Sequence, residues 1–208
     1  LREGAVAVAE VASLAHEKSV IDLAISTVGN GTNKTWSGSS GSDPVDDVDT
    51  AILSVIKTCG YGSLMGIGIL FGATAWRIFK NSTPVKNRFI VGSSKSGVGL
   101  AVPYEQLASQ MFAGSPEVKT SYMVYDSAAE GVAKSLSFVL DSAVLIFARQ
   151  ANPTRRDPSF MKTFRLMNKY MVPGSYVRED GRAEVAKFDW SEDVKVTNSA
   201  ACVRLNPS

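Results

Sequence analysis

Residues 3–26 constrain the fold most, because they contain no proline and a single glycine, Gly4. Apolar side chains recur along this stretch at steps of three and four residues, with acidic side chains on the opposite side. The apolar members are Ala7, Val11, Leu14, Ile21 and Ile25, and the acidic members are Glu10, Glu17 and Asp22. This pattern predicts one amphipathic helix, longer than the average of about 11–12 residues. Lys18 falls on the apolar side and must reach solvent or find a partner.

Composition favours a folded chain that buries much of its surface. With 208 residues and 45% hydrophobic content, it can form a sizeable core. Charged residues make up 20%, and the net charge of +2 is too small to indicate a nucleic-acid binder. The sequence opens inside the helical pattern without a signal peptide, so we expect further chain upstream. Cys59 and Cys202 fit neither a disulfide framework nor a metal motif, which predicts two buried apolar side chains.

Four aspartates (Asp43, Asp46, Asp47 and Asp49) lie close together before an apolar segment. A calcium loop would need alternating oxygen ligands, a turn glycine and a distal glutamate, and the segment lacks this pattern. A helix start explains the residues better, because Ser42 or Asp43 can cap it and Pro44 suits its first position. The acids then lie where the helix dipole favours negative charge. The apolar face of this predicted helix is Val45, Val48, Ile52, Val55, Ile56 and Cys59, followed by Gly60 as its end.

The remaining elements indicate an α+β fold, with helices early and strands late. Segment 64–79 is too short for a membrane span and carries Arg77, so we predict a buried strand over 67–71 and a helix over 73–80. Another helix follows Pro103, with Leu107, Ala108, Met111 and Phe112 inward and Gly114 at its end. Strands are predicted over 117–126, 135–150 and 201–205, and a long hairpin pairs 159–172 with 182–190. Segment 28–44 is predicted to be an irregular connection.

Patterns typical of enzymes are weak in this sequence. The stretch 92–99 resembles a phosphate loop, but Lys95 precedes Gly97, which is the wrong order. His16 is the only histidine, and we expect it to be solvated or at an interface. A small hydrolase using Cys59 and His16, and a calcium-binding module, remain remote alternatives. We therefore expect no enzymatic activity, no cofactor and no metal.

A cluster of basic side chains occupies residues 149–170 against one acid, Asp157. The cluster consists of Arg149, Arg155, Arg156, Lys162, Arg165 and Lys169. It can be a solvated strand face and loop, which we favour, or a charged contact with a neighbouring subunit. Nucleic-acid binding is the third interpretation, since no pattern of base-stacking aromatic residues accompanies the charges.

The order of several segments resembles the core of the major capsid proteins of tailed bacteriophages. "SDPVDDVDTAILSVIKTCG" is similar to the family's helix introduced by Ser-Asp-Pro, and "GILFGATAWRIFKNSTPVKNRF" to its buried strand, helix and Pro-Val-x-x-Arg turn. "YEQLASQMF" and "TSYMVYDSA" follow in the family's order. "LDSAVLIFARQANPTRRDPSFMKTF" and "SEDVKVTNSAACVRL" resemble its later strands and closing segment. The resemblance covers nearly all of the chain through order and spacing.

This resemblance implies a shell subunit with two domains. A peripheral domain would comprise residues 1–43 and 155–190, with the long spine helix and the hairpin. An axial domain would comprise residues 44–154 and 191–208. The family's N-terminal arm and extended loop have no counterpart in this sequence. The exposed acids Asp46, Asp47 and Asp49 and the basic residues Arg155, Arg156, Lys162, Arg165 and Lys169 are predicted to contact other subunits.

The implied function is structural. The protein would assemble with itself into hexamers and pentamers of an icosahedral phage or prophage head that encloses double-stranded DNA without sequence-specific binding. Scaffold and portal proteins would be further partners, and no membrane would be involved. The expected location is the virion, and the host cytoplasm during assembly. An encapsulin-type nanocompartment subunit, which shares the fold but encloses protein cargo, is the alternative.

Overall fold

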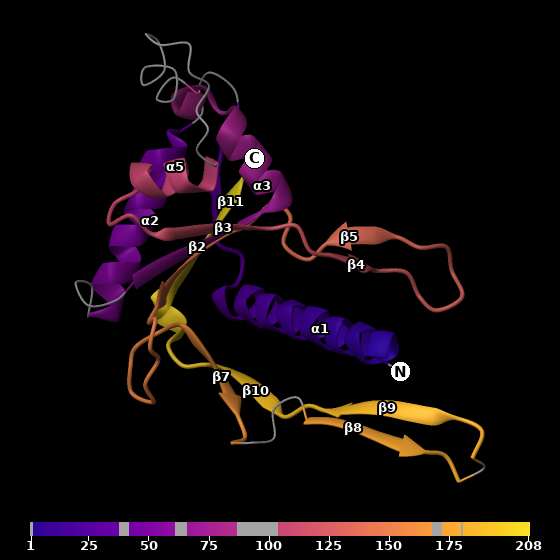
Figure 1. Cartoon of the computed structure of the whole chain (residues 1–208). Helices are drawn as coiled ribbons and strands as arrows, with labels where there is room; N and C mark the ends of the chain where they lie inside the picture. Colours follow the sequence, from indigo (N-terminus) through magenta and orange to yellow (C-terminus); the bar gives the residue numbers. More distant parts are fainter. Residues whose placement is uncertain (1, 38–41, 61–65, 87–103, 168–171, 180) are drawn as a thin grey trace, which may run out of the picture.

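A computed structural model describes residues 2–37, 42–60, 66–86, 104–167, 172–179 and 181–208. A compact body carries two projecting β arms, with a long helix, α1 (Arg2–Val28), running between them (Figure 1). The sequence-based expectation of an α+β fold is confirmed. Helices α1, α2 (Pro44–Cys59), α3 (Ala73–Asn81) and α5 (Tyr104–Met111) lie in the first part of the chain, and most strands follow them.

The body is built on a five-stranded mixed sheet of order β1-β11-β6-β2-β3. These strands are β1 (Thr32–Lys34), β11 (Cys202–Pro207), β6 (Val144–Arg149), β2 (Gly66–Gly72) and β3 (Glu117–Ser121). The β1–β11 and β2–β3 pairs are parallel, and the two pairs that β6 makes are antiparallel. The prediction that 28–44 is irregular is therefore wrong at β1, a three-residue strand whose partner is β11, at residues 205–207.

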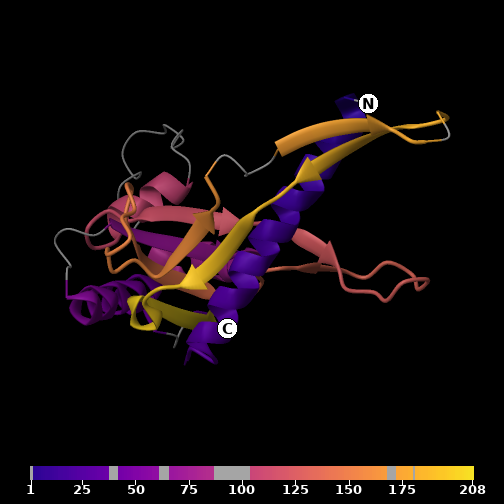
Figure 2. The ribbon, with the colours of Figure 1, turned by 90° about the horizontal axis from the view of Figure 1, so that it is seen from below.

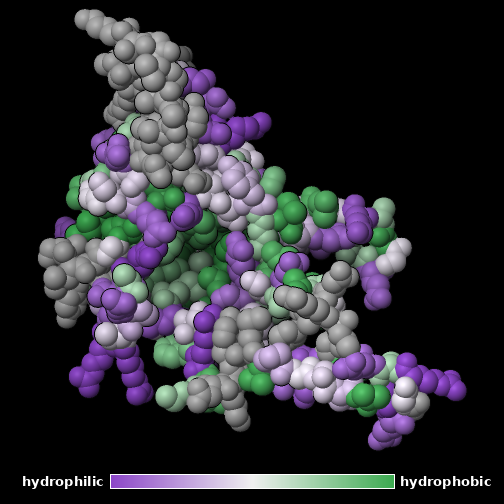
Figure 3. Space-filling view, in the orientation of Figure 1, coloured by the Kyte–Doolittle hydropathy of each residue, from purple (hydrophilic) through white to green (hydrophobic). Residues whose placement is uncertain are grey.

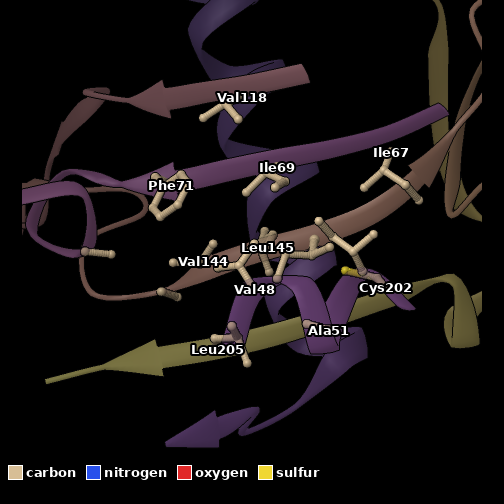
Figure 4. Packing of buried hydrophobic residues seen from close by; sticks show 14 of the residues in the cluster. Val48, Ala51, Ile67, Ile69, Phe71, Val118, Val144, Leu145, Cys202 and Leu205 are labelled. Carbon is tan, nitrogen blue, oxygen red and sulfur yellow. The ribbon is translucent and has the colours of Figure 1, made fainter. Parts of the chain in front are cut away.

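Helix α2 packs along the sheet and forms much of the core. Val48, Ile52 and Val55 are fully buried, and Figure 4 shows Val48 and Ala51 among residues of β6 and β11, including Val144, Leu145 and Leu205. Helix α3 adds an aromatic cluster in which Trp76 and Phe79 stack at 5.5 Å. Edge-on and tilted contacts join these rings to Trp36, Phe71 and Phe112. The predicted apolar face of α2 is confirmed, except that Ile56 is only partly buried.

Helix α1 has the predicted length, but only its second half packs against the body. Ile21 and Ala24 are buried, whereas Val11 and Leu14 are 66% and 49% exposed. The prediction of one buried stripe is therefore wrong for the first half. Figure 2 shows the reason, because the first half extends past the sheet and only the β8–β9 arm runs beside it. Lys18 finds the partner it was expected to need in Asp22, one turn away.

Two arms project from the body. The first is a hairpin of β4 (Val124–Asp126) and β5 (Leu136–Phe138), and it splits the strands predicted over 117–126 and 135–150. The second continues from the pair β7 (Met161–Arg165) and β10 (Glu192–Val196) into the pair β8 (Val172–Val177) and β9 (Glu184–Asp189). The predicted hairpin exists, but it is longer and its turn comes later, since part of the expected connection forms β8. The predicted final strand is confirmed as β11.

Candidate functional site

The acidic segment begins helix α2, as the sequence predicts. The Asp43 carboxylate accepts a hydrogen bond from the Val45 backbone N–H at 3.0 Å, which caps the helix. Pro44 occupies the first position, and Gly60 ends the helix in the left-handed conformation with φ of 69°. Within the described residues, no group of three or more His, Cys, Asp and Glu side chains is arranged to hold a metal ion. The local role of these acids is therefore in folding the start of α2.

Asp47 differs from its neighbours because it is buried. Its carboxylate accepts hydrogen bonds from Lys34 Nζ at 2.6 Å, from Trp36 Nε1 at 2.9 Å and from the Ser42 hydroxyl at 2.5 Å. Burial alone would raise the pKa of Asp47, but these hydrogen bonds and the Lys34 charge outweigh it and lower the pKa below its usual value. The expectation that Asp47 is exposed is wrong, because its carboxylate is buried against Lys34, Trp36 and Ser42.

The other two acids keep more contact with solvent. Asp46 is exposed on the first turn of α2. Asp49 is half-buried and accepts a hydrogen bond from the Ala113 backbone N–H at 2.8 Å, which ties α2 to the end of α5. Of the three predicted contact acids, Asp46 thus has the most accessible carboxylate.

Three of the six residues of the predicted basic cluster are paired within the chain. Arg149 forms an ion pair with Glu117 of β3, and Arg165 lies 3.7 Å from the Glu192 carboxylate. Lys162 Nζ lies 3.1 Å from Asp157 Oδ2. Arg155 and Arg156 are exposed in the loop between β6 and β7. Lys169 lies outside the described residues.

Asp157 organises this loop. Its carboxylate accepts hydrogen bonds from the backbone N–H groups of Thr154 at 2.7 Å and Ser159 at 3.0 Å, and also from the Ser159 hydroxyl. Burial opposes ionisation, but these donors and Lys162 prevail and lower the pKa of Asp157 to about 2. The ionised carboxylate therefore holds the loop that presents Arg155 and Arg156.

The exposed acid and the exposed bases lie at opposite ends of the sheet. Strand β6 starts at Val144, which pairs with Leu205 of β11. The same end of β11 pairs with Lys34, the residue that binds the start of α2 through Asp47. Strand β6 finishes at Arg149, just before the loop that carries Arg155 and Arg156. Asp46 thus lies toward one end of the sheet, and Arg155 and Arg156 lie toward the other.

A groove of about 900 Å³ lies between the second half of α1, strands β2 and β6, and strand β7. Its apolar surface includes Val20, Ile21, Leu70, Phe147 and Phe160. Basic side chains border it, contributed by Arg149, Arg155, Lys162 and Arg165. Figure 3 shows hydrophobic side chains gathered in a hollow on this side of the molecule. The sequence analysis did not find this groove, because its walls come from segments more than 100 residues apart in the chain.

The groups that a hydrolase would need are not assembled in the described part of the chain. The His16 Nδ1 atom lies against the Glu192 carboxylate of β10. Cys59 and Cys202 are buried and free, as predicted. Burial raises the pKa of the Cys59 thiol, and raises that of Cys202 to about 12, so both stay protonated and weakly nucleophilic. The loop 92–99 lies outside the described residues.

The candidate membrane segment is also accounted for. Residues predicted as a strand and a helix form β2 and α3, as expected. Among the helices of the described residues, none combines the length and the apolar character that crossing a membrane requires.

Comparison with known proteins identifies the fold. No protein family model and no curated protein matches the chain. A crystal structure of a phage-related protein from Bordetella bronchiseptica RB50 matches with a TM-score of 0.75 at 16% identity. The match covers 96% of this chain and 65% of that one, so the chain spans just under two thirds of that protein's length.

Two phage capsid structures match as well. The mature capsid of bacteriophage PhiM1 gives a TM-score of 0.52 at 10% identity, over 95% of this chain and 60% of that one. The capsid of cyanophage P-SCSP1u gives 0.50 at 13% identity, over 100% and 65%. The chain therefore has the fold of phage capsid proteins, and the fold expected from the sequence resemblance is confirmed.

Proposed function

We propose that the protein is a structural subunit of a phage head, which assembles with itself into rings of six and five subunits and so encloses double-stranded DNA. The observation that carries this proposal is helix α1 within a capsid fold. Apolar side chains are exposed on several sides of its first half, at Val6, Val8, Val11 and Leu14. Large apolar side chains that are exposed together favour neighbours that cover them. Further subunits would supply those neighbours.

The charge distribution supports assembly into rings. A contact that joins two different surfaces of identical subunits repeats from copy to copy and closes into a ring if the rotation permits. Asp46 at one end of the sheet and Arg155 and Arg156 at the other end suit such a head-to-tail contact. Their role would be to set register and speed association more than to supply affinity.

The paired basic residues have a different role in this proposal. Lys162 and Arg165 already have intramolecular partners, so they would shape the contact surface around Arg155 and Arg156. Lys169 and Asp49 remain proposed contact residues. Residues 1–43 and 155–190 would form the peripheral part of the subunit, and residues 44–154 and 191–208 the axial part. Scaffold and portal proteins are proposed partners during assembly in the host cytoplasm, before the virion is complete.

Electron microscopy of the purified protein over a range of concentration and salt tests this function. We expect rings or closed polyhedral shells to form. A protein that stays monomeric under all conditions would contradict the proposal. Asp46→Lys and Arg156→Glu should each weaken assembly, and the double variant should recover part of the lost assembly. Asp46→Lys should also lower stability by up to about 1 kcal/mol, because it puts a positive charge at the start of α2. Asp189→Lys, which makes the same charge change at an exposed site on the β8–β9 arm, is the matched control for Asp46→Lys.

A further inference from the structure

We propose that the tip of the β4–β5 arm of one copy binds in the apolar groove of the next copy, the groove bounded by α1, β6 and β7. This inference rests on the proposed function, because it assigns a contact between copies of the chain. It goes further in naming the two surfaces that meet and the residues that carry the contact. Arg155, Lys162 and Arg165 are predicted from the sequence to contact other subunits, but neither the groove they border nor the arm is predicted from it.

The groove needs an occupant with apolar and acidic groups. Its walls carry Leu70, Phe147 and Phe164, and Phe164 is 46% exposed. None of its lining residues is acidic. Three of its four bordering cations pair with acids outside the groove, namely Arg149 with Glu117, Lys162 with Asp157 and Arg165 with Glu192. Arg155 is the exception, since it forms no ion pair with any residue that the structure describes.

The tip of the β4–β5 arm has the complementary composition. Residues 127–135, "SAAEGVAKS", form the loop closed by Asp126 and are small or apolar apart from two charged residues, Glu130 and Lys134. Glu130 and Val132 are exposed, with Val132 at 66%. A volume of about 900 Å³ is near the upper end of the roughly 300–1,000 Å³ found for ligand pockets, so the groove is large enough for several such small side chains. Apolar contacts would fill the groove while Glu130 meets Arg155.

The arm is held in shape before it meets a partner. Asp126 Oδ1 accepts hydrogen bonds from the backbone N–H groups of Ala128 and Ser135, each at 3.0 Å, which closes the loop at the tip. These hydrogen bonds also lower the pKa of Asp126, so the carboxylate is ionised at neutral pH. At the base of the arm, Lys18 of α1 lies 4.6 Å from the centre of the Tyr125 ring. A preorganised element loses less conformational entropy on binding, which suits a contact surface.

The positions of the two surfaces favour binding between copies. Figures 1 and 2 both show the arm projecting away from the body. The arm follows β3, whose last residue, Ser121, pairs with Gly72 at the end of β2. The groove includes Arg149, at the opposite end of β6 and next to the start of β2 at Gly66. The base of the arm lies beside α1 near the groove, where Lys18 meets Tyr125, but its tip projects away from the body, which favours binding to another copy.

A charge-swap cycle tests the predicted Glu130–Arg155 contact. Glu130→Arg and Arg155→Glu should each raise the protein concentration needed for half-maximal assembly, followed by light scattering, by about three- to tenfold. The double variant should restore much of the loss, because the pair is reversed. Glu179→Arg, at an exposed site near the tip of the other arm, is the control and should change this concentration by less than about twofold. Single variants that assemble like the wild type, or a double variant no better than either, would overturn the arm contact.

Disulfide trapping supplies a measurement that does not depend on assembly. Protein with Ala129→Cys at the tip is mixed with protein carrying Thr163→Cys in the groove wall, under mild oxidation. We expect a covalent dimer joined between positions 129 and 163, identified by mass spectrometry. Ser175→Cys on β8, mixed with the same Thr163→Cys protein, should give little dimer. No tip–groove disulfide, or an equal yield from the control, would overturn the inference.

The two proposals fail in distinguishable ways. One outcome is that shells form although no tip–groove disulfide is found and although the Glu130 and Arg155 variants assemble like the wild type. That result would contradict the arm contact and still support the capsid function. A specific disulfide in a protein that never forms rings or shells would support the arm contact and contradict the capsid function.

Discussion

The indole nitrogen of Trp36 donates a hydrogen bond to the Asp47 carboxylate across 2.9 Å and so connects the segment after β1 to the first turn of α2. Trp36 is almost completely buried, and its ring contacts Phe79 at 6.0 Å. Lys34 reaches the second carboxylate oxygen from β1. Asp47 therefore joins helix α2, strand β1 and the aromatic cluster at one point.

We expect Asp47→Asn to lower the free energy of unfolding by about 2–3 kcal/mol, because Lys34 and Trp36 lose a charged acceptor in a buried site. Asp46→Asn is the matched control on the same helical turn, and should change stability by less than about 0.5 kcal/mol, since Asp46 is exposed. Denaturant unfolding with an unchanged m-value measures both. Equal losses of unfolding free energy for Asp47→Asn and Asp46→Asn would show that Asp47 stabilises the protein only through the helix dipole.

Stability should fall on acidification partly through Asp157. Its pKa is about 2 in the folded protein, below the ordinary value of about 3.9, so the folded state binds fewer protons than the unfolded state. The stabilising contribution is complete above about pH 4 and is lost as the pH falls through about 2. Asp157→Asn lacks this contribution. The free energies of unfolding of the wild type and Asp157→Asn should therefore approach each other as the pH falls from 5 to 2. A difference between them that stays constant with pH would contradict the role of ionised Asp157.

The two cysteines should resist alkylation in the native protein. Burial raises both thiol pKa values, to about 12 for Cys202, so little thiolate is present at pH 8. We expect iodoacetamide to label neither residue over a period that labels both in denaturant, as followed by mass spectrometry. Rapid labelling of Cys59 in the folded state would instead indicate an activated nucleophile and favour the hydrolase alternative.

Gly72 should tolerate no side chain. A Cβ atom there would lie 2.2 Å from the backbone oxygen of Asp141, which cannot move without shifting the loop before β6. Gly72→Ala should destabilise the protein by about 1–3 kcal/mol in thermal or denaturant unfolding. Gly4→Ala is the control, because Gly4 has open space in exposed helix α1 and alanine favours helix by about 1 kcal/mol. If Gly72→Ala were as stable as the wild type, the loop before β6 would have to shift to make room for the methyl group.

Local features of the sequence were sufficient to predict helix α2. Its cap, its proline, its dipole-compatible acids and its apolar face all lie within one short segment, and each is observed. The burial of Asp47 could not be predicted in the same way. It depends on Lys34 and Trp36, which are positioned by the pairing of β1 with β11 from the other end of the chain.

Two other differences have similar physical causes. Periodicity identified the apolar residues of α1, but it does not show whether a body covers them, and Val11 and Leu14 extend past it. Pro173 and Gly174 suggested a turn, yet they lie in β8. That strand has β9 as its only partner in the described sheet, so a residue without an N–H is tolerated on it. The groove and the arm could be identified only from the tertiary structure.

The place of β11 in the sheet has a consequence for biosynthesis. Because β11 lies between β1 and β6, residues 32–34 have no strand partner until residues 205–207 have been made. Pairing over so great a separation in sequence is slow, since a long loop must close first. A nascent chain that has left the ribosome only as far as β10 has an open edge at β6, and it cannot complete the sheet on its own. Subunits would then associate only after β11 has been synthesised. Contacts between copies would be delayed until each copy has closed its sheet.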